Sequence, residues 1–244
     1  MAEKAERLDK ILAHQQNISR KDARKLIFTG RVSVNEQVIV SPDQKIFLST
    51  DQLALDGHAL NYSKNLYLML NKPQGVVSAS SGKDGEITVV DLVPLEYQRK
   101  NLFPAGRLDK DTVGFVLLTD DGAFAHAILS PRRHVAKTYE ALLEKPVDQS
   151  DIDAFLSGMT LGDEQLKPAS LKILPSESPE EHRVEIILHE GRYHQIRRMM
   201  HALDNQVLWL KRTQMGNLPL DPSLKPGEMR PLSPEELLKI AEKE

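Results

Sequence analysis

The sequence contains no cysteine, no long apolar run and no internal repeat. Without cysteine the chain can form neither a disulfide framework nor a thiolate metal site, and a reducing compartment is compatible with it. No stretch approaches the roughly 18 consecutive apolar residues of a membrane-spanning helix. The polar residues 1–7 also lack the apolar core of a signal peptide. We therefore expect a cytoplasmic protein with no membrane contact.

The length and composition are those of a folded globular chain. At 244 residues the sequence exceeds the usual size of one domain without reaching two large ones, which predicts one main domain and a smaller appendage. Its 40% hydrophobic and 27% charged residues fit soluble globular proteins rather than disordered or fibrous ones. The residue spacings of dinucleotide, mononucleotide and zinc sites are missing, so we expect no cofactor and no metal.

The net charge of −3 argues mildly against a nucleic-acid partner, because phosphate binding depends on lysine and arginine. The basic residues are, however, concentrated in two places. Residues 20–31 hold five basic residues against one acid, and residues 190–212 hold five against two. Two local basic patches on a mildly acidic protein suit a partner that touches two defined surfaces.

The first sixty residues predict a compact unit of two helices and a hairpin. Residues 7–14 carry apolar side chains at helical spacing. A second helix is expected to start at a Ser19 cap and to end at Gly30, which can adopt a left-handed conformation. Residues 31–34 and 38–40 alternate as the two strands of a hairpin would.

The second predicted helix has a basic outer face. Its residues Ala23, Leu26 and Ile27 face inward, which leaves four basic side chains on the exposed side. This cationic ridge consists of Arg20, Lys21, Arg24 and Lys25. An ordinary solvated helix face explains these residues equally well on their own.

Residues 61–65 predict a linker, and residues 66–244 predict a larger domain. Short apolar or alternating runs indicate strands, and longer periodic stretches indicate helices. Because strands outnumber helices and the loops are short, an α+β sheet covered by helices is favoured over a parallel βαβ sheet. The predicted strands are residues 66–70, 113–118, 137–143 and 184–188, and the predicted helices are residues 123–129, 151–156, 195–202 and one that opens at Ser233.

The most informative stretch is residues 106–122. Asp109 precedes the apolar, β-rich run of residues 113–118, and residues 120–122 close that run as a turn signal. An acid in this place is held at the rim of a rigid element, where reactive groups are well positioned. Taken alone, such an aspartate is more often a turn former that binds its own backbone.

Residues 106–122 resemble the nucleophile motif of RNA pseudouridine synthases, in the branch that modifies ribosomal RNA and carries a small N-terminal RNA-binding domain. The order of helix, basic helix and hairpin over residues 6–55 resembles the S4 RNA-binding domain. Residues 137–139 and 190–200 are similar to two further motifs of the same family. The resemblance implies an S4-like domain over residues 1–60, followed by a catalytic α+β domain with a mixed, mainly antiparallel sheet, flanking helices and a central cleft.

The resemblance also implies roles for five side chains. Asp109 matches the nucleophile and Arg197 the cation that pairs with it; an opposite charge within about 4 to 6 Å offsets the rise in pKa that burial gives a carboxyl group. Tyr139 matches the residue that stacks on the target uracil and is a proposed proton acceptor, although a strand tyrosine is more often a core residue. Ile196 would wall the base pocket, and Arg107 would hold the flipped nucleotide.

Further basic residues are expected to bind RNA through phosphates rather than to read its sequence. They are Arg7, Lys10, Arg20, Lys21, Arg24, Lys25, Arg31, Arg132, Arg133, Arg192 and Arg198. Family members use no metal or organic cofactor. His194 and His201 are seven residues apart and share a predicted helix face, but no third metal ligand accompanies them, so hydrogen-bonded or solvated histidines are the better interpretation.

Within the family, residues 69–75, 130–134 and 191–195 most resemble the member that acts on one uridine of the small-subunit (16S) ribosomal RNA. That member has a lysine at the position of Arg197, which keeps the charge. The resemblance therefore implies a monomer that acts on ribosomal RNA, within a small-subunit assembly particle.

Three alternatives stay open from the sequence. The target could lie in the large-subunit (23S) ribosomal RNA. The chain could be a non-catalytic RNA-binding or ribosome-assembly protein, which the intact set of Asp109, Tyr139 and Arg197 disfavours. It could also be a hydrolase with Asp109 and Asp111 as an acid pair, but residues two apart in one loop seldom straddle a sugar.

Overall fold

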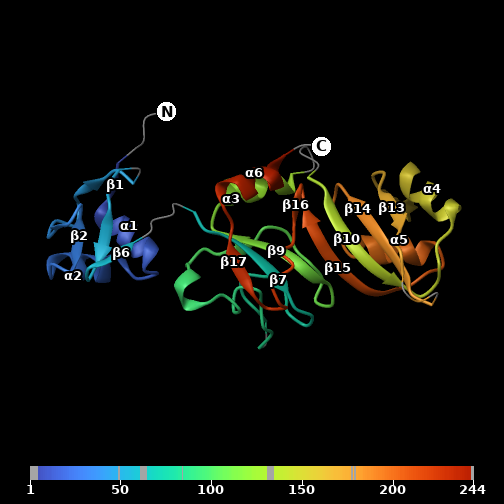
Figure 1. The fold of residues 1–244 in the computed structure, drawn as a ribbon, viewed down its shortest axis with the longest axis horizontal. Coiled ribbons are helices and arrows are strands. Elements are labelled where there is room, and N and C mark those ends of the chain that lie inside the picture. The colour runs from blue at the N-terminus through green and yellow to red at the C-terminus, as the bar shows by residue number, and fades with distance from the viewer. Residues whose placement is uncertain are drawn as a thin grey trace. The chain divides into compact units, whose positions relative to one another are not determined.

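The computed structural model describes residues 5–48, 50–60, 65–83, 85–130, 135–176, 178 and 180–242. The chain divides into two compact units (Figure 1). One unit holds residues 1–66 together with 94–101, and the other holds residues 67–93 and 102–244. The sequence prediction assigned residues 94–101 to the larger domain, whereas the structure groups them with the N-terminal unit.

The helices of the first unit follow from their local sequence. Helix α1 (Leu8–Gln15) and helix α2 (Arg20–Phe28) pack their apolar faces together. The side chain of Ser19 accepts a hydrogen bond from the backbone nitrogen of Asp22, so Ser19 is the predicted N-cap. Gly30 has a φ of +72°, which only glycine adopts readily, and the helix ends before it.

The strands of the first unit form two small antiparallel sheets. Strand β1 pairs with β4, and the other four strands lie in the order β3-β2-β5-β6. Residues 94–101 add the short 3-10 helix η1 (Leu95–Tyr97), and Arg99 donates to the side chain of Gln15 at 3.0 Å. The strand bounds are β1 Glu6–Arg7, β2 Val32–Val34, β3 Gln37–Val38, β4 Lys45–Ile46, β5 Leu53–Leu55 and β6 His58–Leu60.

The second unit is built on one mixed sheet. The main path of described strands runs β13-β14-β10-β15-β9-β7-β17, with β16 paired to β15 and β8 to β9. Every pair is antiparallel except β15 with β9. The bounds are β7 Tyr67–Lys72, β8 Phe103–Pro104, β9 Val113–Thr119, β10 Lys137–Leu143, β13 Ser170–Ile173, β14 His182–Leu188, β15 Val207–Met215, β16 Leu218–Pro219 and β17 Met229–Pro231, and β11 (Thr160–Leu161) pairs separately with β12 (Glu164–Gln165). The α+β prediction is confirmed.

Four helices cover this sheet within the described residues. Helix α3 (Gly122–Leu129) lies beside α6 (Pro234–Ala241), while α4 (Gln149–Ser157) contacts β13 and α5 (Gln195–Ala202) contacts β15 (Figure 1). Asp121 caps α3 by accepting from the backbone nitrogen of Phe124, so the predicted turn at residues 120–122 is the start of that helix. None of the described helices is long and apolar enough to cross a membrane.

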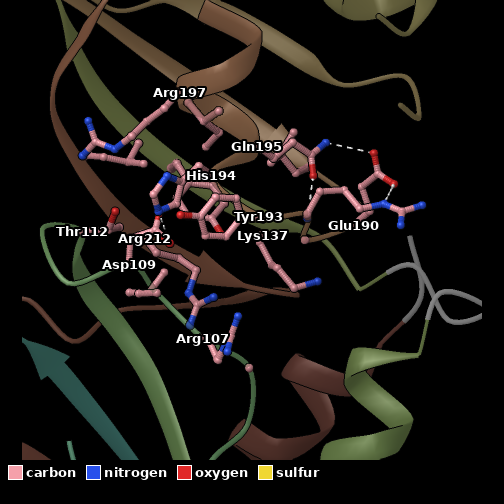
Figure 2. Close-up of a pocket in the computed structure, with 18 of the residues that line it drawn as sticks. Arg107, Asp109, Thr112, Lys137, Glu190, Tyr193, His194, Gln195, Arg197 and Arg212 are labelled. Atoms are coloured by element: carbon pink, nitrogen blue, oxygen red, sulfur yellow. Dashed lines mark hydrogen bonds and ion pairs between the residues drawn. The ribbon is translucent and has the colours of Figure 1, made fainter. Parts of the chain in front are cut away.

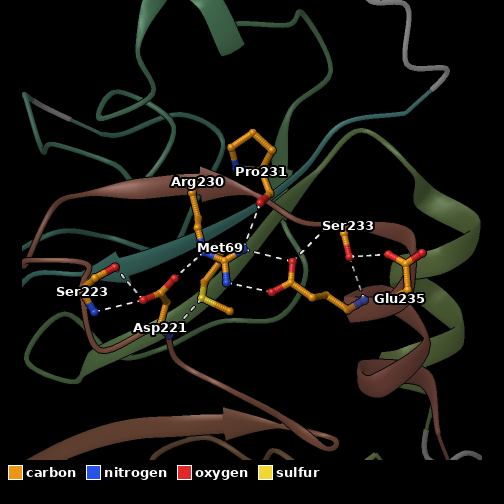
Figure 3. A network of polar contacts seen from close by, with 8 residues as sticks. Met69, Asp221, Ser223, Arg230, Pro231, Ser233 and Glu235 are labelled. Atoms are coloured by element: carbon orange, nitrogen blue, oxygen red, sulfur yellow. Dashed lines mark hydrogen bonds and ion pairs between the residues drawn. The ribbon is translucent and has the colours of Figure 1, made fainter.

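A polar network fastens α6 to the edge of the sheet (Figure 3). Arg230 of β17 binds Asp221, and both terminal nitrogens of its guanidinium donate to Glu236, at 2.7 and 3.0 Å. Glu236 and Ser233 also form the predicted capping box at the start of α6. Hydrogen bonds from Ser223, together with Arg230, lower the pKa of Asp221 to about 2. The C-terminal helix is therefore held by charge-assisted bonds as well as by its apolar face.

A hydrophobic core lies between the sheet and the helices α3 and α6. Phe115 and Leu117 of β9 meet Met69 of β7, Ile128 of α3 and Ile240 of α6, and all five are essentially inaccessible to solvent. Each such side chain contributes about 1.5 to 3 kcal/mol through burial. This packing fixes β9, and with it the loop that precedes it, as a rigid support for a site.

Candidate active site

A cavity of about 450 Å³ opens in the second unit, within the size range of small-ligand sites. The five residues with predicted roles at the target base all line it. Figure 2 shows Arg107, Asp109 and Arg197 around this cavity with the loop that precedes α5. The structure thus brings together Arg107, Asp109, Tyr139, Ile196 and Arg197, which the sequence scatters over ninety residues.

One face of the sheet forms a wall of the cavity. Lys137 and Tyr139 are two residues apart on β10 and therefore point to the same face. Leu188 of β14 pairs with Lys137, and Arg212 of β15 pairs with Tyr139 across a register shift in β10. These four side chains, together with Leu210 of β15, all line the cavity.

The parallel contact between β9 and β15 brings the Asp109 loop to this wall. Gly114 pairs with Arg212 and has a φ of +99°. A Cβ atom at Gly114 would lie 2.3 Å from the carbonyl oxygen of Arg212, so only glycine permits the approach. The strand that follows Asp109 is thereby held against the strand that carries Arg212.

Lys72 holds the Asp109 loop through hydrogen bonds to backbone carbonyls. This lysine is fully buried, and its Nζ donates to the carbonyl oxygens of Pro73, Lys110 and Thr112 at 3.1, 3.2 and 2.7 Å. Burial lowers the pKa of Lys72 to about 8, although the charges of Asp111 and Asp109 act in the opposite direction. Sequence reasoning missed this residue, because two of its three partners, Lys110 and Thr112, lie about forty positions away.

Replacing Lys72 by methionine is expected to change how stability depends on pH. Between about pH 8 and the ordinary lysine pKa of 10.5, the unfolded chain keeps a proton that the folded chain has released at Lys72. Raising the pH through this window therefore favours the folded state. Over this pH window, we expect the unfolding free energy of Lys72→Met to rise by about 1 to 3 kcal/mol less than that of the wild type.

Denaturant unfolding of both proteins at the two ends of this pH window measures the difference. Lys172→Met, at an exposed position of β13, is the matched control and should follow the wild type. An equal rise in wild type and Lys72→Met would mean that Lys72 stays charged in the folded protein.

The carboxylate of Asp109 is partly exposed and faces His194. Its Oδ1 lies 3.4 Å from Nε2 of His194, and the Asp109 side chain is 31% exposed. Asp109 and Arg197 are both described, and the structure shows no ion pair between them. Arg197 binds instead to Asp111 at 2.6 Å and donates to the carbonyl of Val207 at 2.9 Å.

This geometry corrects the expected direct pair of Asp109 with Arg197. The acid that Arg197 contacts comes from the same loop, but two residues further along, where Asp111 projects toward the partly buried guanidinium. The Nε of Arg197 is buried and has no hydrogen-bond partner among the residues that the structure describes. Arg197 nevertheless lines the same cavity as Asp109 and adds positive charge to its wall.

His194 lines the cavity, whereas from the sequence it was expected only as a hydrogen-bonded or solvated histidine. It was expected on a helix face shared with His201, but it is the N-cap of α5 in a left-handed conformation, with a φ of 48° and a ψ of 35°. Its ring stacks on that of Tyr193, with centroids 3.9 Å apart. The sequence feature that could have indicated this conformation is the position of His194 directly before the predicted helix start at residue 195. In the described part of the chain, no group of three acidic or histidine side chains could hold a metal.

The loop before α5 is fixed by a polar network that Figure 2 shows with dashed lines. The buried Gln195 donates to Glu190 at 2.9 Å and accepts from the backbone nitrogen of Arg192 at 3.0 Å. Glu190 also accepts from the backbone nitrogen of Lys167 at 3.0 Å. These bonds hold Tyr193 and the residues around it at the cavity without needing a ligand.

Two cations of the cavity wall were also missed. Arg212 is 2% exposed; its Nε donates to the carbonyl of Phe115 at 2.7 Å, and its Nη2 is buried without a partner. Lys137 is 8% exposed, and its Nζ donates to the carbonyl of Val135 at 2.9 Å. Burial, and after it the charge of Arg212, lowers the pKa of Lys137 to about 8.

In the first unit, three predicted RNA-binding arginines surround one buried acid. Arg7, Arg20 and Arg24 bind the fully buried carboxylate of Asp9 at 3.1, 2.9 and 2.9 Å, while keeping about 40 to 55% of their side chains exposed. Burial alone would raise the pKa of Asp9, but the hydrogen bonds from the three arginines outweigh it and hold the pKa well below its ordinary value.

The other predicted RNA-binding residues fall into four groups. Lys21 and Lys25 are exposed, and Arg192 lines the cavity. Lys10, Arg31 and Arg198 form ion pairs with Glu6, Asp56 and Glu164 respectively. Arg132 and Arg133 lie outside the described residues.

The chain resembles known proteins over nearly its whole length. The family model described as RNA pseudouridylate synthase matches residues 66–202, and the S4 domain model matches residues 6–46. An uncharacterized RNA pseudouridine synthase of Bacillus subtilis (strain 168) is 41% identical over 95% of this chain and 96% of that protein. Ribosomal small subunit pseudouridine synthase A of Pasteurella multocida (strain Pm70) is 42% identical over 95% of this chain and 97% of its own. The protein of the same name in Escherichia coli (strain K12) is 40% identical over 96% of this chain and 99% of its own.

A solved structure agrees with these relatives. It is described as a crystal structure of pseudouridylate synthase and matches with a TM-score of 0.65 and 38% sequence identity. The match covers 96% of this chain and 99% of the other. Sequence and fold therefore point to the same family over both units of the chain.

Proposed function

The chain belongs to the RNA pseudouridine synthase family and carries an N-terminal S4 domain, and from that premise we propose that it converts one uridine of the small-subunit (16S) ribosomal RNA to pseudouridine. The observation that carries the choice of RNA is the full-length similarity, at about 40% identity, to proteins named ribosomal small subunit pseudouridine synthase A. The protein is an isomerase, and we propose Asp109 as its nucleophile.

The reaction breaks the bond between ribose C1′ and uracil N1, turns the base, and joins C1′ to C5. The target must leave its stack, because its reacting atoms are inaccessible inside a helix. A cavity of about 450 Å³ with Asp109 on one side and Tyr139 on the wall is suited to an extruded uridine. Asp109 is the acid of this cavity that comes from the matching motif, and its partly exposed carboxylate can meet C1′ directly.

The other cavity residues support the same proposal. Tyr139 offers a ring on which uracil can stack, which would contribute about 1 to 3 kcal/mol. Ile196 is buried and gives the pocket an apolar side. Arg107 is exposed at the start of the Asp109 loop, where it can bind a phosphate or take the place left by the flipped base.

The N-terminal unit supplies a second surface for RNA. Asp9 holds the guanidinium groups of Arg7, Arg20 and Arg24 side by side while leaving them partly exposed. Such a pre-arranged cluster can bind phosphates with little loss of side-chain entropy. Phosphate contacts of this kind position an RNA without reading its sequence, so we propose that this surface orients ribosomal RNA while the cavity selects the uridine.

The test is to incubate the purified protein with 16S RNA, with 23S RNA and with small-subunit particles, and to map pseudouridine in each. We expect one new pseudouridine, confined to the 16S RNA, in the free RNA or in the particle. Modification of 23S RNA alone would contradict the proposed target. Tight binding to all three without any modification would support a non-catalytic assembly protein instead.

A further inference from the structure

Two buried positive charges in the cavity wall lack an acidic partner. Lys137 and Arg212 are at most 8% exposed, and the one described hydrogen bond from each side chain goes to a backbone carbonyl. Among the described residues, no carboxylate forms an ion pair with either of them. The Nη2 of Arg212 has no hydrogen-bond partner in the part of the chain that the structure describes.

Such a pair is costly for the folded protein. A charge removed from water is ordinarily paired with an opposite charge or fully hydrogen-bonded, because desolvation alone costs several kcal/mol. The cost is visible in the pKa of Lys137, which burial and the neighbouring Arg212 lower to about 8. An anion that enters the cavity would remove this cost, so the pair points to a negatively charged species during function.

The position of the pair indicates where this negative charge arises. Lys137 and Arg212 flank Tyr139 on the same sheet face, two residues along β10 and across the pair with β15. They therefore lie beside the ring proposed to stack on uracil. The exposed Arg107 and Arg192 are the better placed cations for RNA phosphates.

We propose that Lys137 and Arg212 stabilise the negative charge that uracil carries when its bond to ribose breaks. This inference rests on the proposed function. When the C1′–N1 bond breaks, its electron pair passes to the base, and the charge is shared by N1 and the two carbonyl oxygens. The Asp109 carboxylate forms a bond to the electron-poor C1′. C5 of the turned base then attacks C1′ and displaces the carboxylate, C5 loses its proton and N1 takes one up, so that Asp109 is regenerated and the product is an isomer of the substrate.

The physical advantage is that the cations are already in place. Fixed charges in a dry site stabilise a developing anion strongly, since no solvent has to reorganise. They interact little with the neutral uracil of the bound substrate. The pair should therefore raise the rate of bond cleavage without strengthening RNA binding.

Lys137→Met tests this, because methionine keeps the length of the side chain and removes its charge. In single-turnover reactions at saturating enzyme, we expect the rate to fall about 10- to 100-fold, while the Kd for RNA and its salt dependence change less than about 3-fold. Lys137→Arg should restore most of the rate. Lys172→Met, on the exposed edge strand β13, should behave as the wild type.

A second measurement separates charge stabilisation from a structural role. An RNA with 5-fluorouridine at the target offers a base that carries negative charge more readily. Chromatography of nuclease digests measures how fast the N-linked nucleoside disappears. Lys137→Met should slow this reaction less on the 5-fluorouridine RNA than on the uridine RNA. For each protein, the rate on the 5-fluorouridine RNA is divided by the rate on the uridine RNA. Because both rates come from the same protein, this ratio does not depend on the fraction that is folded. Arg212→Gln should shift the ratio in the same direction.

Three results would overturn the inference. The first is an unchanged rate and an unchanged Kd in Lys137→Met. The second is weaker RNA binding with an unchanged rate at saturation, which would mean that Lys137 binds an RNA phosphate. An identical slowing on both RNAs would assign it a purely structural role. If the wild type modifies no RNA, the proposed function fails and this inference fails with it.

Discussion

Asp109→Asn is expected to lower the rate of pseudouridine formation at least about 1,000-fold, the largest effect of any single substitution in this chain. The amide has the shape of the carboxylate but neither its charge nor its nucleophilicity. The proposed step requires an ionised carboxylate at C1′. The loss should therefore appear in the single-turnover rate and not in RNA affinity.

The fold should survive this substitution. Asp109 is about one third exposed, and its described side-chain partner is His194 at 3.4 Å, to which an amide oxygen can also bind. The anchors of the loop come from the backbone, through Lys72 and through the bond from the nitrogen of Leu108 to Ser78. We therefore expect the midpoint of thermal unfolding to stay within about 3 °C of the wild type.

The measurement is pseudouridine mapping on 16S RNA with the variant and the wild type side by side. Asp163→Asn, an exposed acid in the turn between β11 and β12, controls for the loss of one negative charge and should be fully active. Residual activity within ten-fold of the wild type would show that Asp109 is not the nucleophile.

Arg197→Gln is expected to lower the rate about 100-fold, the second largest effect. The guanidinium is about one quarter exposed and places a positive charge in the wall of the cavity that holds Asp109. Its loss removes that charge and leaves the carbonyl of Val207 without its donor. An unpaired carbonyl of this kind costs about 1 to 3 kcal/mol, so stability should fall as well.

The ion pair with Asp111 makes a sharper test possible. Asp111 is about half exposed, and exposed ion pairs contribute about 0 to 1 kcal/mol. If Arg197 acts through its charge in the cavity, Asp111→Asn should lower the rate no more than about 10-fold, much less than Arg197→Gln. Equal losses in the two variants, and no further loss in the double variant, would mean that Arg197 serves to hold the loop through Asp111.

The local sequence determined the described α-helices and some of the strands, but β15, which carries Arg212, was not predicted. Strand β10 and helix α5 begin and end at the predicted residues 137–143 and 195–202, and the caps at Ser19 and Ser233 are those expected. These features depend on periodicity and hydrogen bonds between residues at most four positions apart. The family motifs likewise indicated Asp109, Tyr139 and Arg197 before any tertiary contact was known.

Only the tertiary structure decided which side chains meet. Lys72 reaches the Asp109 loop from another strand, Arg212 joins the cavity through the parallel pairing at Gly114, and Arg197 binds Asp111 rather than Asp109. Such contacts join segments that are remote in the sequence, and they depend on how strands and helices pack around a common core. A local pattern specifies the element on which a residue lies and the face that it occupies, whereas its partner is set by the arrangement of all the elements together.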